Sequence, residues 1–126
     1  YLMKKNIFFW GAKYKAGIIY NFINKNELIG INSKFKVSYL FDPGLKTSQF
    51  KSTAIFSNKQ RDLKKFIHNS DYFLTCIGND FGKARYLISK KLEKKLKPLK
   101  IISKNSLVFN KKKIGKGVQI FPGAIS

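Results

Sequence analysis

A chain of 126 residues that is 44% hydrophobic and 15% aromatic is too apolar for a disordered protein, so we expect a folded protein. Its apolar start at Ile7–Trp10 is followed by no small-residue cleavage site, so we expect the protein in the cytoplasm. No apolar run approaches the roughly 20 residues that a membrane span requires, and a single cysteine excludes a disulfide framework and a multi-cysteine metal site within the chain. The formal net charge of +20 is typical of chains that bind polyanions, such as nucleic acid or an anionic membrane surface.

The first part of the chain predicts a strand, a helix and a second strand. Asn6–Trp10 is a short apolar run that stops at Gly11, as in a strand buried on both faces. Apolar residues then recur at helical spacing from Lys15 to about Asn24. Phe35–Phe41 alternates and ends at Asp42-Pro43-Gly44, which predicts a second strand and its loop.

The next elements continue this alternation of strands and helices. In chain order we expect a short strand at Thr53–Phe56, a helix at Gln60–His68, a buried strand at Tyr72–Ile77, an amphipathic helix at Phe81–Leu96 stopped by Pro98, and a strand at Leu99–Ile102. This order predicts an α/β fold, a Rossmann-like, mainly parallel sheet with helices on both faces.

The pattern changes near the end of the chain, where Ile102, Val108, Ile114 and Ile120 fall six residues apart. Such a period is typical of a left-handed parallel β-helix, in which each hexad forms one side of a triangular coil. We therefore expect a Rossmann-like domain over residues 3–103 and the beginning of a hexapeptide-repeat β-helix over 104–126. Two or three hexads are too few to bury a core, so we expect further coils beyond Ser126.

Ligands of open parallel sheets bind where strand carboxyl ends meet helix N-termini, and three loops are expected at that edge. The first holds Gly11, Ala12, Lys13, Tyr14 and Lys15, whose backbone N–H groups could approach an anion. It is an incomplete dinucleotide fingerprint, because the next glycine is Gly17. A glycine that only closes a strand-to-helix turn explains this loop equally well.

The other two loops carry polar side chains. Asp42 stands where such folds often accept a ribose hydroxyl, although an Asp-Pro-Gly turn accounts for it as well. Gly78 and Asn79 are candidate nucleotide contacts and Lys83 a candidate phosphate contact, whereas Asp80 is expected to cap a helix.

Cys76 and His68 are of residue types that often act in catalysis, but their surroundings in the sequence do not favour such a role. Cys76 lies within an apolar strand, where a free thiol behaves as a small hydrophobe. His68, the single histidine, ends a helical stretch beside polar residues and is expected at the surface. We therefore predict no catalytic residue in this chain.

Four segments together resemble the bacterial sugar O- and N-acetyltransferases of the sialic-acid and bacillosamine type. They are Lys5-Asn6-Ile7-Phe8-Phe9-Trp10-Gly11-Ala12, Leu40-Phe41-Asp42, Phe73-Leu74-Thr75-Cys76-Ile77-Gly78-Asn79-Asp80, and the closing hexads. The resemblance covers essentially the whole chain. It implies an N-terminal domain whose loops hold the nucleotide part of a nucleotide-sugar, ahead of a left-handed β-helix.

The same resemblance implies an activity for the intact protein. It would be a homotrimer that binds acetyl-CoA between neighbouring subunits and transfers the acetyl group to a sugar hydroxyl or amine, without a metal. The catalytic histidine of the family lies in later coils, beyond Ser126, where it acts as general base. The acetyl-CoA site is likewise expected outside this chain.

Some residues of the chain depart from the pattern of this family and favour a different function. Lys13, Tyr14 and Lys15 replace the last three positions of a loop that usually reads Gly-Ala-Gly/Ser-Gly-His, and Pro43 replaces a common second acid. These changes favour a non-catalytic nucleotide-binding or regulatory domain.

Charge-driven nucleic-acid binding is the third hypothesis. Against it, the chain has only two arginines, the residue preferred for bidentate phosphate contacts, and its richness in Asn and Ile is typical of an AT-rich genome. We therefore rank nucleic acid low among partners, and expect the charge to attract a nucleotide-sugar. A dinucleotide-dependent oxidoreductase ranks lower still, since the closing hexads have no place in it.

Overall fold

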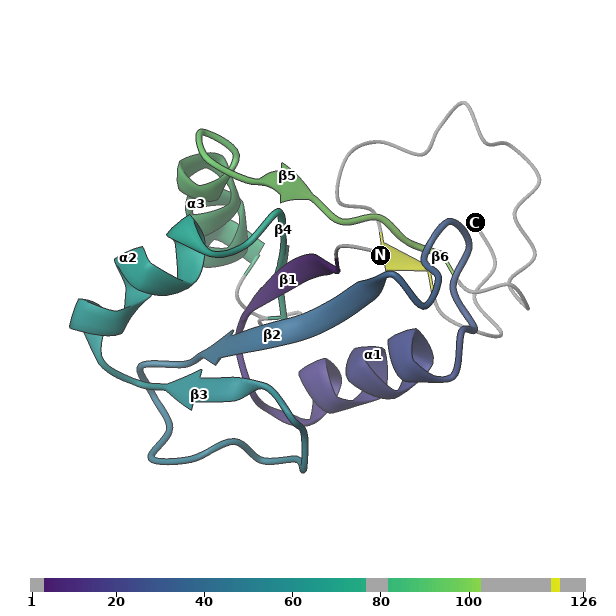
Figure 1. The fold of residues 1–126 in the computed structure, drawn as a ribbon. Helices are drawn as coiled ribbons and strands as arrows, with labels where there is room; N and C mark the ends of the chain where they lie inside the picture. The colour runs from purple at the N-terminus through teal and green to yellow at the C-terminus, as the bar shows by residue number, and fades with distance from the viewer. Residues whose placement is uncertain (1–3, 77–81, 103–118, 121–126) are drawn as a thin grey trace.

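The computed structural model describes residues 4–76, 82–102 and 119–120. Its main sheet has five strands in the order β3-β2-β1-β4-β5, and every neighbouring pair is parallel. Figure 1 shows this sheet with its three labelled helices, α1, α2 and α3. The predicted α/β class with a mainly parallel sheet is confirmed.

The elements have the following bounds. The strands of the main sheet are β1 Lys5–Trp10, β2 Phe35–Phe41, β3 Ile55–Ser57, β4 Tyr72–Thr75 and β5 Lys97–Pro98. The helices are α1 Tyr14–Asn24, α2 Gln60–His68 and α3 Gly82–Leu92. A separate pair of short parallel strands consists of β6 Ile101–Ile102 and β7 Gln119–Ile120.

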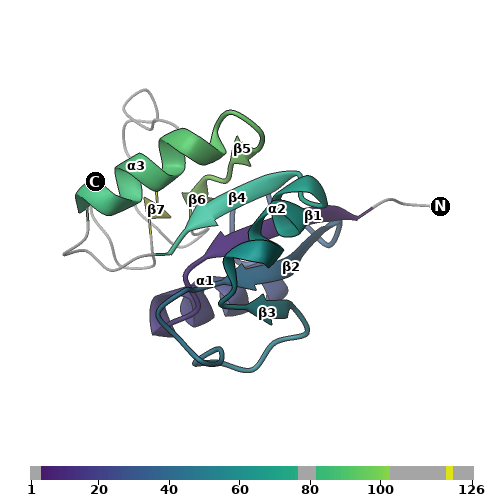
Figure 2. The same cartoon turned by 90° about the vertical axis from the view of Figure 1, so that its left-hand side faces the viewer.

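Consecutive residues of the central strand β1 build two different cores, because side chains alternate across a strand. Phe9 belongs to a cluster that includes Ile19 and Ile23 of α1, whereas Phe8 belongs to one that includes Phe66 of α2 and Leu92 of α3. One helix therefore covers one face of the sheet and two cover the other, as Figures 1 and 2 show. This arrangement confirms the prediction of helices on both faces.

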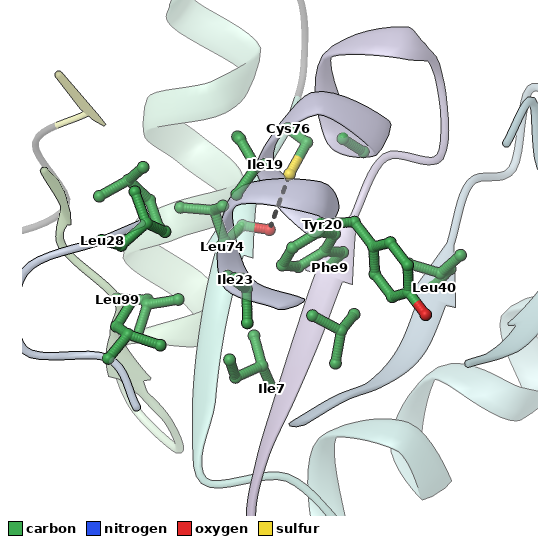
Figure 3. Packing of buried hydrophobic residues seen from close by; sticks show 14 of the residues in the cluster. Ile7, Phe9, Ile19, Tyr20, Ile23, Leu28, Leu40, Leu74, Cys76 and Leu99 are labelled. Atoms are coloured by element: carbon green, nitrogen blue, oxygen red, sulfur yellow. Dashed lines mark hydrogen bonds between the residues drawn. The ribbon is translucent and has the colours of Figure 1, made fainter. Parts of the chain in front are cut away.

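The core under α1 is drawn in Figure 3. Cys76 lies within it at 3% exposure, with its Sγ 4.0 Å from the Leu74 carbonyl oxygen. Burial raises the pKa of this thiol well above its usual range. The prediction that Cys76 is a buried apolar residue is confirmed.

The register of the central strands brings their carboxyl ends together. Trp10, the last residue of β1, is paired with Phe41 on one side and with Thr75 on the other. Because parallel strands run in the same direction, the loops that leave all three strands begin at one edge of the sheet.

Most predicted boundaries agree with the structure to within a residue or two, and those of β2 and α2 agree fully. The expected helix end at Leu96 is wrong, since α3 ends at Leu92 and the next residues form a turn. The expected strand at Leu99–Ile102 is only half right, since Ile101–Ile102 forms β6 but Leu99 and Lys100 are in no strand. The strand that pairs with β4 comes earlier, at Lys97–Pro98.

The predicted β-helix falls largely on residues that the structure does not describe, including Val108 and Ile114. Of residues 104–126 the structure describes only β7, which pairs with β6: Ile101 is paired with Gln119 and Ile102 with Ile120. Within the described residues, no helix is long and apolar enough to cross a membrane.

Candidate functional site

The candidate site lies at the carboxyl edge of the sheet, above β1. The chain continues from β1 to β2 on one side, while β4 lies on the other. Strand order therefore reverses at β1, and in open parallel sheets ligands bind at such a switch point. The predicted loops that begin at Gly11 and Asp42 meet there.

Gly11 closes the first loop against the end of β4. Its φ is +117°, and a Cβ added to it would lie 2.8 Å from the carbonyl oxygen of Cys76. The Cys76 amide in turn donates to the carbonyl of Trp10 at 2.7 Å. Only glycine combines this backbone conformation with so close an approach to a neighbouring strand.

Asp42 ties the second loop to the first. One carboxylate oxygen accepts the amide N–H of Ala12 at 3.1 Å, and the other accepts that of Gly44 at 3.0 Å. The second contact is the local bond expected of an Asp-Pro-Gly turn. A carboxylate has about four acceptor positions, so these two bonds still allow it to accept a ligand hydroxyl.

The backbone amides at the start of the first loop are already used within the protein. Gly11 donates its N–H to the carbonyl of Phe41 at 2.7 Å, and Ala12 donates to Asp42. The next donors are those of the first turn of α1, which have no partner within a helix. No side chain caps this helix at Lys13, and its first turn contains no acidic residue. An anion at this edge would therefore meet the start of α1.

Basic side chains from two helices gather at this position. Lys13 and Tyr14 are exposed and Lys15 is half-buried. Burial, and next the nearby guanidinium of Arg85, lower the pKa of the Lys15 ammonium. Arg85 lies in the first turn of α3. The same turn contains Lys83, the predicted phosphate contact, which is exposed.

Arg85 was not among the predicted site residues, although it follows the predicted phosphate contact Lys83 by two residues in the same helix. Two other predicted contacts, Gly78 and Asn79, lie outside the described residues, as does Asp80. The structure thus brings together the first loop, Asp42 and the start of α3.

The loop after β2 packs against the first loop and α1. Gln49 donates its amide N–H to the carbonyl of Ala12 at 2.9 Å, and the ring of Phe50 lies against Gly17, so closely that an added Cβ would be 3.0 Å from it. The hydroxyl of Tyr20 accepts the amide of Thr53 at 3.1 Å. These contacts hold the site loops on the helix that begins at Lys13.

We expect Asp42→Ala to lower the free energy of unfolding by about 2 kcal/mol, because it leaves the buried amide of Ala12 without its acceptor. The matched control is Asp71→Ala, which removes a carboxylate that accepts the exposed amide of Asn6 at 2.9 Å. Water replaces that bond, so its cost should stay below about 1 kcal/mol. Urea denaturation of both variants measures the difference; equal losses would contradict a bracing role for Asp42.

His68 ends α2, and the chain then enters β4 from its amino end, so this exposed histidine lies at the opposite edge of the sheet. Its predicted surface position is confirmed. Among the described residues, no three His, Cys, Asp or Glu side chains are grouped so as to hold a metal ion.

In comparisons with known proteins, no family model, no curated protein and no solved structure matches this chain.

Proposed function

We propose that this chain is the N-terminal, substrate-binding part of a sugar acetyltransferase and holds the nucleotide part of a nucleotide-sugar at the carboxyl edge of its sheet. The observation that carries the proposal is the uncapped start of α1 at the strand switch point, with Lys15 and Arg85 beside it. The acetyl group would come from acetyl-CoA and pass to a sugar hydroxyl or amine in a part of the protein beyond Ser126.

The chemistry of the edge suits a nucleoside diphosphate. The first-turn amides of α1 and the positive end of its dipole favour phosphate, and the lysines add point charges. Asp42 retains acceptor positions for a ribose hydroxyl. Tyr14, 74% exposed at the start of α1, offers a ring on which a base can stack.

The assignment to an acetyltransferase rests on the resemblance and on the pairing of β6 with β7. That pairing has an offset of 18 residues. Three hexads make one triangular coil, so residues 18 apart lie side by side in consecutive coils of a left-handed β-helix. This offset supports a β-helix whose first strand is β6, slightly before the expected start at residue 104. The homotrimer that binds acetyl-CoA between subunits is proposed from the resemblance alone.

Calorimetric titration with UDP and a UDP-amino sugar at moderate salt tests the site. We expect saturable binding that weakens about tenfold in Lys13→Gln/Lys15→Gln, because this change removes two charges from the start of α1. The matched control, Lys59→Gln/Lys64→Gln, removes two exposed charges at α2 and should leave the affinity within about twofold.

Two outcomes would count against the proposal. The first is no binding of either compound at millimolar concentration, and the second is an equal loss in both double variants. The first outcome would leave the non-catalytic regulatory domain as the better hypothesis, since Gly11 and Ala12 already use their amides within the protein.

A further inference from the structure

The outward surface of α3 combines positive charge with apolar side chains. Its exposed residues along the helix include Lys83, Tyr86, Leu87, Lys90 and Lys91, which we call the α3 outer face. Their spacing of three or four residues places them on one stripe of the helix. The opposite stripe holds Ile88 and Leu92, which pack in the core shared with α2.

Positive charge is concentrated around this helix. Residues 82–100 contain eight lysines and arginines against one acidic residue, Glu93, whereas the whole chain carries +20 over 126 residues. All eight basic residues except Arg85 are exposed. The neighbouring α2 covers the same face of the sheet and adds exposed Arg61, Lys64 and Lys65. Figure 2 shows the two helices on this side of the sheet.

Apolar side chains lie in the middle of this charge. Leu87 is 51% exposed and Tyr86 is 60% exposed. The ammonium of Lys90 lies 5.4 Å from the centre of the Tyr86 ring and 3.8 Å from a carboxylate oxygen of Glu93. Leu87 is therefore surrounded by lysines along the helix while its own side chain remains largely in water.

This combination favours a lipid surface over other polyanions and over a second copy of the chain. Two like-charged outer faces would repel one another. Duplex nucleic acid is gripped through phosphate contacts, to which an exposed leucine adds little. An anionic bilayer attracts lysines electrostatically and also takes up leucine and tyrosine side chains at its headgroup boundary.

We infer that the α3 outer face binds the surface of an anionic lipid bilayer, with its lysines at the headgroups and Leu87 inserted between them. The helix is held by its core contacts, so the face is presented without a folding step. This inference goes beyond the proposed function and does not depend on it.

Vesicle flotation with the full chain tests the inference, using phosphatidylcholine vesicles with and without the anionic lipid phosphatidylglycerol. We expect binding to the anionic vesicles only, weakened by high salt. Lys90→Gln/Lys91→Gln should lower the partition coefficient about 30-fold, since each lysine near an anionic surface adds roughly fivefold. Leu87→Gln should lower it several-fold with no change of charge. Lys83 stays unchanged, because it belongs to the candidate site.

The matched control is Lys25→Gln/Lys34→Gln, which removes two exposed charges outside α3 and should change the partition coefficient less than about threefold. All five substituted positions are exposed, so each variant should keep the wild-type thermal transition, and circular dichroism checks this. An equal loss in both double variants would overturn the inference. So would a lack of binding to anionic vesicles, whether or not the chain binds duplex DNA in a parallel assay.

Discussion

Gly11→Ala should destabilise this protein by about 3 kcal/mol and lower its melting temperature by on the order of 10 °C. Two effects add. Alanine at a φ of +117° is strained by itself, and its Cβ would lie 2.8 Å from the oxygen and 3.0 Å from the carbon of the Cys76 carbonyl. That carbonyl belongs to the backbone at the end of the neighbouring strand, so it cannot rotate away as a side chain could. Urea denaturation measures the loss directly.

Gly30→Ala separates the two effects. Gly30 also has a positive φ, +80°, but no heavy atom lies within 4 Å of an added Cβ. Alanine there carries only the backbone strain, which we expect to cost about 1 kcal/mol. If the two variants lost the same stability, the close approach of Gly11 to β4 would contribute nothing, and the proposed geometry at the switch point would be wrong.

The elements that could be predicted from sequence are those whose patterns are local. β1 is a continuous apolar run that a glycine ends, and α2 has one apolar stripe with Leu63 and Phe66 buried. Such patterns depend on periodicity within a few residues, so the type and bounds of these elements follow from the sequence.

The region after α3 could not be predicted because long-range pairing decides it. Lys97 donates its amide to the carbonyl of Asp71 at 3.2 Å, and Leu99 donates to that of Phe73 at 2.9 Å. Proline disfavours the helical region for the residue before it, which suits Lys97 to an extended strand. Pro98 lies in β5 at the edge of the sheet, where its missing N–H removes no ladder bond.

The candidate site also has one part that local sequence patterns predict and another that depends on long-range contacts. That Gly11 and Asp42 end adjacent strands follows from the order of elements, and their loops do meet. That the Ala12 amide is already bonded to Asp42, and that Arg85 lies near Lys15, depends on three-dimensional distances between separate elements. No periodicity within the sequence encodes such distances, so only the structure moves the expected anion contact from Gly11 and Ala12 to the start of α1.

Phe8→Ala should lower the free energy of unfolding by about 4 kcal/mol. Phe8 is fully buried in the central strand, and its ring centre lies 6.3 Å from that of Phe66 in α2 and 6.4 Å from that of Trp10. Truncation opens a cavity between the sheet and the layer of two helices, and the surrounding strands hold that cavity open because they are paired on both sides.

An aromatic residue outside the core provides the comparison for Phe8. Tyr86→Ala removes a ring of similar size that is 60% exposed, so we expect a change within about 0.5 kcal/mol. Chemical denaturation of both variants measures the contribution of the core under α2 and α3, provided that the dependence of the free energy of unfolding on denaturant concentration is unchanged. A loss below about 1.5 kcal/mol for Phe8→Ala would mean that the two helices do not pack on β1 as described, and the basic surface they present would lose its rigid support.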